Sequence, residues 1–145
     1  MSKRWSKLQA RLYNIVDPCL NFQIHCAVYE MNGNSLYHGN KLPRYWITVG
    51  KDVVFDYPKG FDTNSLYGYN SYPWDGVIEN ISNSIENYLQ TPKGLLMHSF
   101  DSDITGITNI LRVCDKRIGK RRLREIYNNT DDFNIRYIID LRLNA

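Results

Sequence analysis

The chain has 145 residues, of which 43% are hydrophobic and 23% charged, and its formal net charge is +3. This composition is near the globular average, which excludes general disorder and a fibrous protein. No apolar run approaches the roughly 20 residues that span a bilayer, and the N-terminus lacks the apolar stretch of a secretion signal. We therefore expect a single domain over residues 1–145, located in the cytoplasm and without a membrane partner.

The three cysteines are Cys19, Cys26 and Cys114. An odd number of cysteines without a secretion signal favours reduced thiols, and we expect all three to be small buried hydrophobic residues. Their spacing lacks the short separation of zinc-binding pairs, and the neighbours His25 and Cys26 point to opposite faces of a strand. The sequence therefore predicts neither a metal nor a cofactor.

Apolar residues at helical spacing predict an amphipathic helix over residues 2–16, which ends at Asp17-Pro18. Its remaining faces carry basic residues. Strict alternation predicts a half-buried strand over residues 22–31. The turn-rich link at residues 32–43 is expected to be a surface loop.

The central stretch, residues 44–57, predicts a β-hairpin folded over Gly50-Lys51. The predicted register places Trp46 opposite Phe55 and joins the hairpin to strand 22–31 in a three-stranded antiparallel sheet. The hairpin face expected to cover the core carries Trp46, Thr48, Val53, Phe55 and Tyr57.

Residues 58–74 show no regular period and are rich in tyrosine, glycine, serine and asparagine. A loop of this length is either functional or disordered, and tyrosine among small polar residues is typical of adaptable contact surfaces. The alternative is a loop that folds back over the sheet and buries its rings. The residues expected to form a protein-binding surface are Tyr67, Tyr69, Tyr72 and Trp74.

The remainder of the chain predicts helices. The first is a long helix over residues 74–90, expected to cover the Trp46 and Phe55 face of the hairpin. Two shorter ones follow over 103–114 and 120–128. These elements together predict an α+β fold with an N-terminal helix, a sheet with a central hairpin, a long covering helix and a C-terminal helical cluster.

Two details of these helices are open in the sequence. The N-cap of helix 103–114 is either Asp101 or Ser102. Residues 130–143 fit a strand by their alternation, or a helix capped by Thr130 and closed by Arg142. We favour the helix.

Basic side chains concentrate at residues 112–124, where Asp115 is the one acid. Two short helices joined near Gly119, the second opening on cations, fit an element that contacts phosphates. A solvated basic helix face is the alternative, because the overall charge is modest for a nucleic-acid-binding protein. The nucleic-acid candidates are Lys116, Arg117, Lys120, Arg121, Arg122 and Arg124, with Lys3, Arg4 and Lys7 as an extension.

A metal-dependent hydrolase would require an acid and a lysine that alternate on one strand, and Pro58 separates Asp56 from Lys59. Asp101 and Asp103 could add carboxylates, but Asp101 is better explained as a helix cap. The sequence has no nucleophile elbow and no phosphate-binding loop. It therefore predicts no catalytic residues and a protein that is not an enzyme.

Three runs of the sequence, KRWSKLQ, PRYWITVG with VVFDYPK, and RIGKRRL, resemble a family of small, uncharacterised bacterial cytoplasmic proteins. The resemblance extends over nearly the whole chain. It implies a small soluble bacterial protein and supplies no site residues.

The function expected from the sequence is that of a non-enzymatic binding protein that acts through protein contacts. An immunity or antitoxin protein, which neutralises a partner, is of this type. Interface hot spots are enriched in Tyr, Trp and Arg, which directs attention to the tyrosine-rich segment. The alternative is a nucleic-acid-binding protein that uses residues 112–124.

Overall fold

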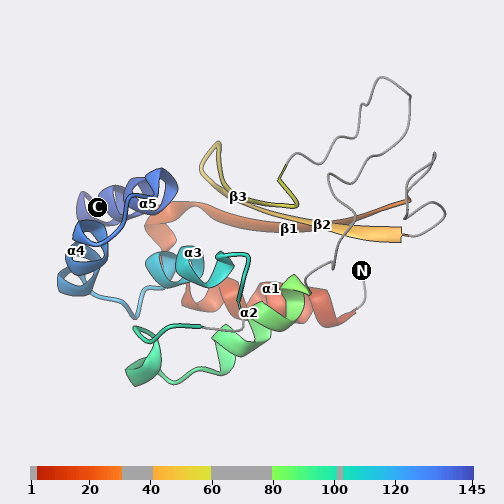
Figure 1. The fold of residues 1–145 in the computed structure, drawn as a ribbon, viewed down its shortest axis with the longest axis horizontal. Helices are drawn as coiled ribbons and strands as arrows, with labels where there is room; N and C mark the ends of the chain where they lie inside the picture. Colours follow the sequence, from red (N-terminus) through yellow and green to blue (C-terminus); the bar gives the residue numbers. More distant parts are fainter. Residues whose placement is uncertain (1–2, 31–40, 60–79, 101–102) are drawn as a thin grey trace.

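The computed structural model describes residues 3–30, 41–59, 80–100 and 103–145. A three-stranded antiparallel sheet lies over a layer of helices (Figure 1). The elements are α1 (Lys3–Ile15), β1 (Phe22–Glu30), β2 (Lys41–Val49), β3 (Asp52–Tyr57), α2 (Ile81–Gln90), α3 (Ile107–Cys114), α4 (Lys120–Asn128) and α5 (Phe133–Leu143), with short 3₁₀ turns at Pro18–Leu20 and Lys93–Leu95. This order confirms the α+β fold. No helix in these ranges is long and apolar enough to cross a membrane.

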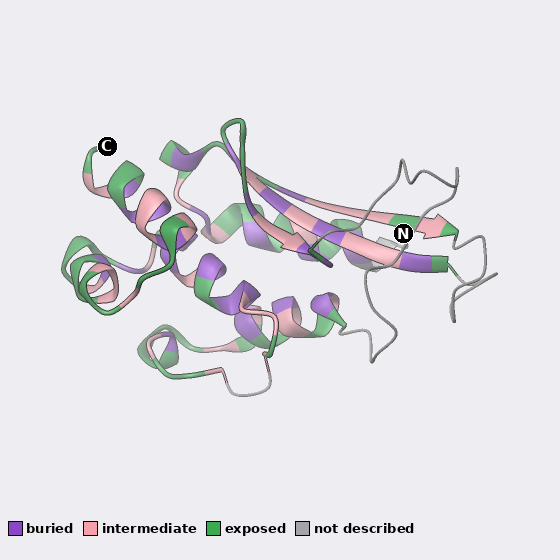
Figure 2. Cartoon of the chain, turned by 45° about the horizontal axis from the view of Figure 1, so that its top comes forward, coloured by how far each residue is buried: buried purple, intermediate pink, exposed green. Residues whose placement is uncertain are grey.

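The inner face of the sheet packs against α1. The Trp5 ring meets the Tyr45 ring edge-on at 5.6 Å between centroids, and the Gln9 side chain donates a hydrogen bond to the Ile24 carbonyl at 2.8 Å. Figure 2 shows buried stretches along the strands and on the helices beneath them. The core therefore lies between one face of the sheet and the helical layer.

The register of the hairpin differs from the prediction. Val49 pairs with Asp52 as expected, but a β-bulge between Ile47 and Thr48 places Ile47 opposite Phe55. The predicted pair of Trp46 with Phe55 is therefore wrong. One extra residue in a strand turns every later side chain to the other face.

The predicted core face of the hairpin is wrong for Trp46, Thr48 and Val53. The core is covered by Tyr45, Ile47 and Val49 of β2, and Ile47 is 0% exposed. Val53 is 53% exposed, although Tyr57 is buried and Phe55 packs against the core as predicted. The cause is the partner strand, because β1 pairs Ile24 with Ile47 and so joins the apolar sides of both strands.

Trp46 lies on the outer face of the sheet, where its neighbours cover it. The His25 ring stacks on it at 4.9 Å, and the Arg44 guanidinium lies 4.8 Å from its ring centroid. Arg44 also pairs with Asp56 at 3.3 Å. These contacts make Trp46 half-buried, although it is not part of the core.

Helix α2 begins at Ile81, because Asn80 has an extended backbone and its side chain accepts a hydrogen bond from the Asn83 amide. The predicted start at residue 74 lies outside the described residues. The helix packs against α1 and α3, and the hydroxyl of Ser82 hydrogen-bonds that of Tyr45 on the inner face. Trp46 lies on the other face of the sheet, so the expectation that α2 covers it is wrong.

The C-terminal helices follow the prediction with changed ends. Helix α4 has the expected bounds, and residues 133–143 form a helix, as favoured. The cap of α5 is Asp132, whose carboxylate accepts hydrogen bonds from two backbone amides, and not Thr130. Helix α3 starts at Ile107 rather than near 103, since Gly106 before it has a φ of +83°.

Two further expectations on loops and thiols have mixed outcomes. The predicted surface loop lies outside the described residues, except that residues 41–43 belong to β2. Cys114 is fully buried, and burial raises the pKa of its thiol. Cys19 is exposed, so its expected burial is wrong.

A buried carboxylate joins the helices at the turn between α3 and α4. Asp115 is fully buried, and it accepts a 2.6 Å hydrogen bond from the Tyr88 hydroxyl of α2. Arg117 pairs with the same carboxylate at 2.7 Å. Burial, together with the nearby charge of Asp115, raises the pKa of the Tyr88 hydroxyl.

The backbone of the same turn is held by its neighbours in space. Arg142 of α5 donates to the carbonyls of Val113, Asp115 and Ile118. The Lys116 amide donates to the Ile15 carbonyl at the end of α1 at 2.8 Å. The turn thus connects α1, α2 and α5.

Replacing Asp115 with alanine should lower the free energy of unfolding by about 3 kcal/mol, because the buried Tyr88 hydroxyl and Arg117 lose their shared acceptor. Tyr88→Phe should lower it by about 1–2 kcal/mol. Urea unfolding measures both. Arg11→Ala, which breaks the exposed pair with Glu86, is the control, with an expected loss of less than about 1 kcal/mol. Equal midpoints for Asp115→Ala and Arg11→Ala would contradict this role of Asp115.

Candidate binding surfaces

The residues predicted for protein contact, Tyr67, Tyr69, Tyr72 and Trp74, lie outside the described residues. The side chains of Lys3 and Arg4 do so as well. Lys7 is exposed on α1.

Two arginines of the basic segment are engaged within the protein itself. Arg117 pairs with Asp115, and this hydrogen bond raises the pKa of its guanidinium. Arg112 donates to the carbonyls of Leu96 and His98, and burial lowers its pKa. The nucleic-acid role predicted for Arg117 is therefore not supported, since its charge serves to balance a buried acid.

The other five cations have a different environment. In the described part of the chain, the ion pairs are made by Arg11, Arg44, Arg117 and Arg142. The five remaining side chains make no ion pair there, and four of them are exposed while Arg122 is half-buried. They are Lys116, Lys120, Arg121, Arg122 and Arg124. We call this group the α4 basic surface.

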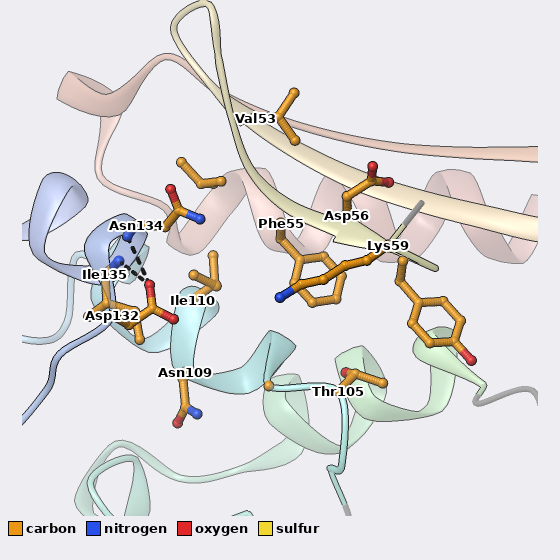
Figure 3. Close-up of a pocket in the computed structure, with 13 residues that line it drawn as sticks. Val53, Phe55, Asp56, Lys59, Thr105, Asn109, Ile110, Asp132, Asn134 and Ile135 are labelled. Atoms are coloured by element: carbon orange, nitrogen blue, oxygen red, sulfur yellow. Dashed lines mark hydrogen bonds between the residues drawn. The ribbon is translucent and has the colours of Figure 1, made fainter. Parts of the chain in front are cut away.

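A cleft of about 400 Å³ lies between β3 and the N-terminal ends of α3 and α5. Figure 3 shows Phe55 from the strand, Ile110 from α3 and Ile135 from α5 around it. These three side chains give the cleft an apolar floor. A volume of this size falls within the range of ligand-binding sites.

The cleft follows the edge of the sheet. It is lined by every residue from Val53 to Tyr57. Phe55 and Asp56 point to opposite faces of the sheet, since they pair with Ile47 and Trp46. A cleft lined by both runs along the strand's edge. In the described ranges β3 has β2 as its neighbour on one side only, so the edge on the cleft side is not paired by another described strand.

The carboxylates at the cleft have structural partners. Asp56 is paired with Arg44, and Asp132 accepts the amides of Asn134 and Ile135 at 2.8 and 3.1 Å. Lys59, Asn109 and Thr105 add donors and acceptors to the lining (Figure 3). This arrangement suits hydrogen bonding around an apolar centre.

Large apolar side chains are exposed around the cleft. Phe133 is 79% exposed and Ile104 is 75% exposed, the two highest values among the large hydrophobic residues described. Each is next in sequence to residues that line the cleft, and the exposed Val53 lines it directly. We call Val53, Ile104 and Phe133 the apolar rim.

Asp103 holds the loop that leads from Ile104 into α3. Its carboxylate accepts hydrogen bonds from the amides of Thr105, Gly106 and Thr108 and from both threonine hydroxyls, at 2.7–3.2 Å. Burial opposes its ionisation, but the hydrogen bonds from Thr108 and Thr105 outweigh this, so the pKa of Asp103 is lowered. The rim and the cleft wall at Thr105 are thus fixed in position.

A comparison with protein families matches residues 4–72 and 78–143 to the model of the SF0329 protein family. The chain belongs to the SF0329 protein family. The match covers nearly the whole of this chain, as the resemblance of the three sequence runs implied. Comparisons with curated proteins and with solved structures gave no match. The functional assignment of this SF0329 family protein therefore rests on its own surfaces.

Sequence patterns did not identify the apolar rim, although one signal was present. On α5 the residues Ile135, Ile138 and Ile139 form the buried stripe. Phe133 lies on the opposite side of the helix from this stripe, because successive residues are 100° apart. A large apolar residue opposite a complete stripe is the signal that indicates an exposed contact.

Asp103→Asn should lower the free energy of unfolding at neutral pH by about 1 kcal/mol, since it weakens a capping carboxylate. The pKa of Asp103 is below its ordinary value of 3.8 in the folded protein. Its stabilising effect is therefore complete above that value and is lost as the pH falls through the folded pKa. The difference between wild type and variant, measured by urea unfolding, should shrink in acid. Asp131→Asn, at an exposed position, is the control. A difference independent of pH would contradict this role.

Proposed function

We propose that the protein is a non-enzymatic binding protein that acts through protein contacts at the cleft beside β3. The partner would place an extended segment along the strand's edge. The observation that carries the proposal is that the cleft runs along the edge of β3 and is flanked by the apolar rim.

The edge of β3 supports this mode of binding. An edge strand offers a row of backbone N–H and C=O groups, and an extended peptide can pair with them as an added strand. The apolar floor of Phe55, Ile110 and Ile135 lies beside this edge. Alternate side chains of the bound segment would pack on this apolar floor. This packing would select segments with apolar residues at those positions.

The apolar rim supports a partner that is larger than a small molecule. Phe133 and Ile104 do not contribute to the core at their exposures of 79% and 75%. Exposed large apolar groups beside a groove, with polar groups such as Asn109 and Asn134 around them, resemble the apolar centre and polar rim of protein interfaces.

The tyrosine-rich segment predicted for protein contact follows β3 directly in the sequence. We propose that its residues Tyr67, Tyr69, Tyr72 and Trp74 contribute to protein contact, as the sequence predicts. An immunity or antitoxin role in a bacterial cytoplasm, which the sequence led us to expect, is the biological setting that we propose for this binding.

The test is affinity purification of the tagged protein from its native host with nuclease treatment, followed by mass spectrometry. Wild type should retain one protein in stoichiometric amount. The double variant Ile104→Ser/Phe133→Ser should reduce its recovery about tenfold or more, as expected for interface hot spots. Both residues are exposed, so the Tm should be unchanged.

The matched control is Leu95→Ser, another exposed apolar residue that is not part of the cleft lining. It should leave the recovery unchanged. Equal recovery of the partner by the double variant and by wild type would overturn the proposed site. Recovery of nucleic acid alone, with no stoichiometric protein, would overturn the proposed function.

A further inference from the structure

Helix α4 opens with cations where a helix favours acids. Lys120, Arg121 and Arg122 form its first turn, which has no acidic residue, and the N-cap Gly119 provides no capping side chain. The N-terminal end of a helix carries a partial positive charge, so cations there are destabilising. The sequence departs from this stability rule at three consecutive positions, which is expected where function requires it.

In the described part of the chain, no acid forms an ion pair with these cations. Asp115, the nearest preceding acid, is buried and paired with Arg117. Glu125 is the one acid on α4, and it makes no ion pair among the described residues. An external anion would satisfy the whole group.

The cations are displayed on one side of the helix. Leu123 is buried, and α4 packs against α5 through this side. Lys120, Arg124 and Arg121 are exposed, and at 100° per residue they lie about 60°, 100° and 160° around the helix from Leu123. Figure 1 shows α4 below α5 at one end of the helical layer.

An aromatic and arginine pair adjoins this surface. Tyr127 follows Arg124 by three positions and is half-buried. The Arg136 guanidinium of α5 lies 4.9 Å from the Tyr127 ring centroid. The Nε atom of Arg136 is buried and has no hydrogen-bond partner in the described part of the protein.

We infer that the α4 basic surface binds single-stranded nucleic acid, with phosphates on the cations of α4 and a base stacked at the Arg136–Tyr127 pair. Guanidinium planes and tyrosine rings are the platforms on which unpaired bases stack. Lys116, on the turn before α4, extends the phosphate-binding group. This surface is separate from the cleft beside β3, so the inference goes beyond the proposed function.

Single-stranded nucleic acid fits better than other polyanions, because a duplex, an anionic membrane or an acidic protein would use the charges alone. In a duplex the bases are already stacked on one another. The Arg136–Tyr127 pair adds a planar group beside the cations, which only an exposed base can use.

The test is fluorescence anisotropy with labelled single-stranded RNA and DNA of on the order of 12 nucleotides, a length suited to single-strand sites, and with duplexes of matched sequence. The single strands should bind more tightly. For four phosphate contacts the slope of log affinity against log salt should be near −3, at about 0.7 per contact.

Two variants separate stacking from charge. Arg136→Lys keeps the charge and loses the plane, so it should weaken single-strand binding about tenfold and leave duplex binding unchanged. Tyr127→Leu should act in the same direction. Equal affinity for single strand and duplex, with no effect of Arg136→Lys, would overturn the inference.

Lys120→Glu tests two points together: the role of the α4 cations in binding, and the destabilising effect of a cation at the helix N-terminus. It should reduce binding and lower the salt slope by about 1 or more, while the Tm rises because an acid replaces a cation at the helix N-terminus. Lys51→Glu makes the same charge change at the exposed hairpin turn and should alter neither. An equal loss of binding in both variants, or binding only to vesicles of anionic lipid or to an acidic protein, would overturn the inference.

The double variant Ile104→Ser/Phe133→Ser should bind nucleic acid as wild type does. The proposed protein contact and the nucleic-acid surface can therefore fail independently, because each has its own variants and its own ligand. Loss of nucleic-acid binding in this double variant would contradict the separation of the two surfaces.

Discussion

The buried carboxylate of Asp115 is the constraint on which the helical layer depends. A buried carboxylate must have hydrogen-bonding partners. Tyr88 of α2 and the neighbouring Arg117 bind the side chain, while Arg142 of α5 binds the Asp115 carbonyl. The turn that precedes α4 is therefore held by elements that differ widely in sequence position. This fixes the orientation of α4 and, through α5, one wall of the cleft.

The order of the elements could be predicted from the sequence, because hydrophobic periodicity depends on local geometry. The face of the hairpin could not. The alternation of its residues allows either face to be the core face. Two features determine which one is: the extra residue near Val54, and the pairing of Ile47 with Ile24 on the apolar side of β1. A bulge leaves no clear pattern in a short strand, so the core face was assigned incorrectly to Trp46, Thr48 and Val53, while Phe55 and Tyr57 are on the core side.

The candidate sites were predictable in part, for a related reason. The basic composition of residues 112–124 was visible, but composition does not distinguish a cation that balances a buried acid from one that faces solvent. Arg117 and Lys120 look alike in the sequence, and only the buried position of Asp115 separates them. In α5 the alternation that resembled a strand arises because apolar residues occupy the core side at Ile135 and the outer side at Phe133.

Two consecutive residues of α5 face different surfaces. Ile135 lines the cleft beside β3, and Arg136 lies on the Tyr127 ring of α4. Both are carried by one rigid helix, so a displacement of α5 that improves the fit of a ligand at one surface alters the geometry at the other. Occupancy of the two surfaces would then be thermodynamically linked, and the linkage would be reciprocal, with each ligand changing the affinity for the other by the same factor.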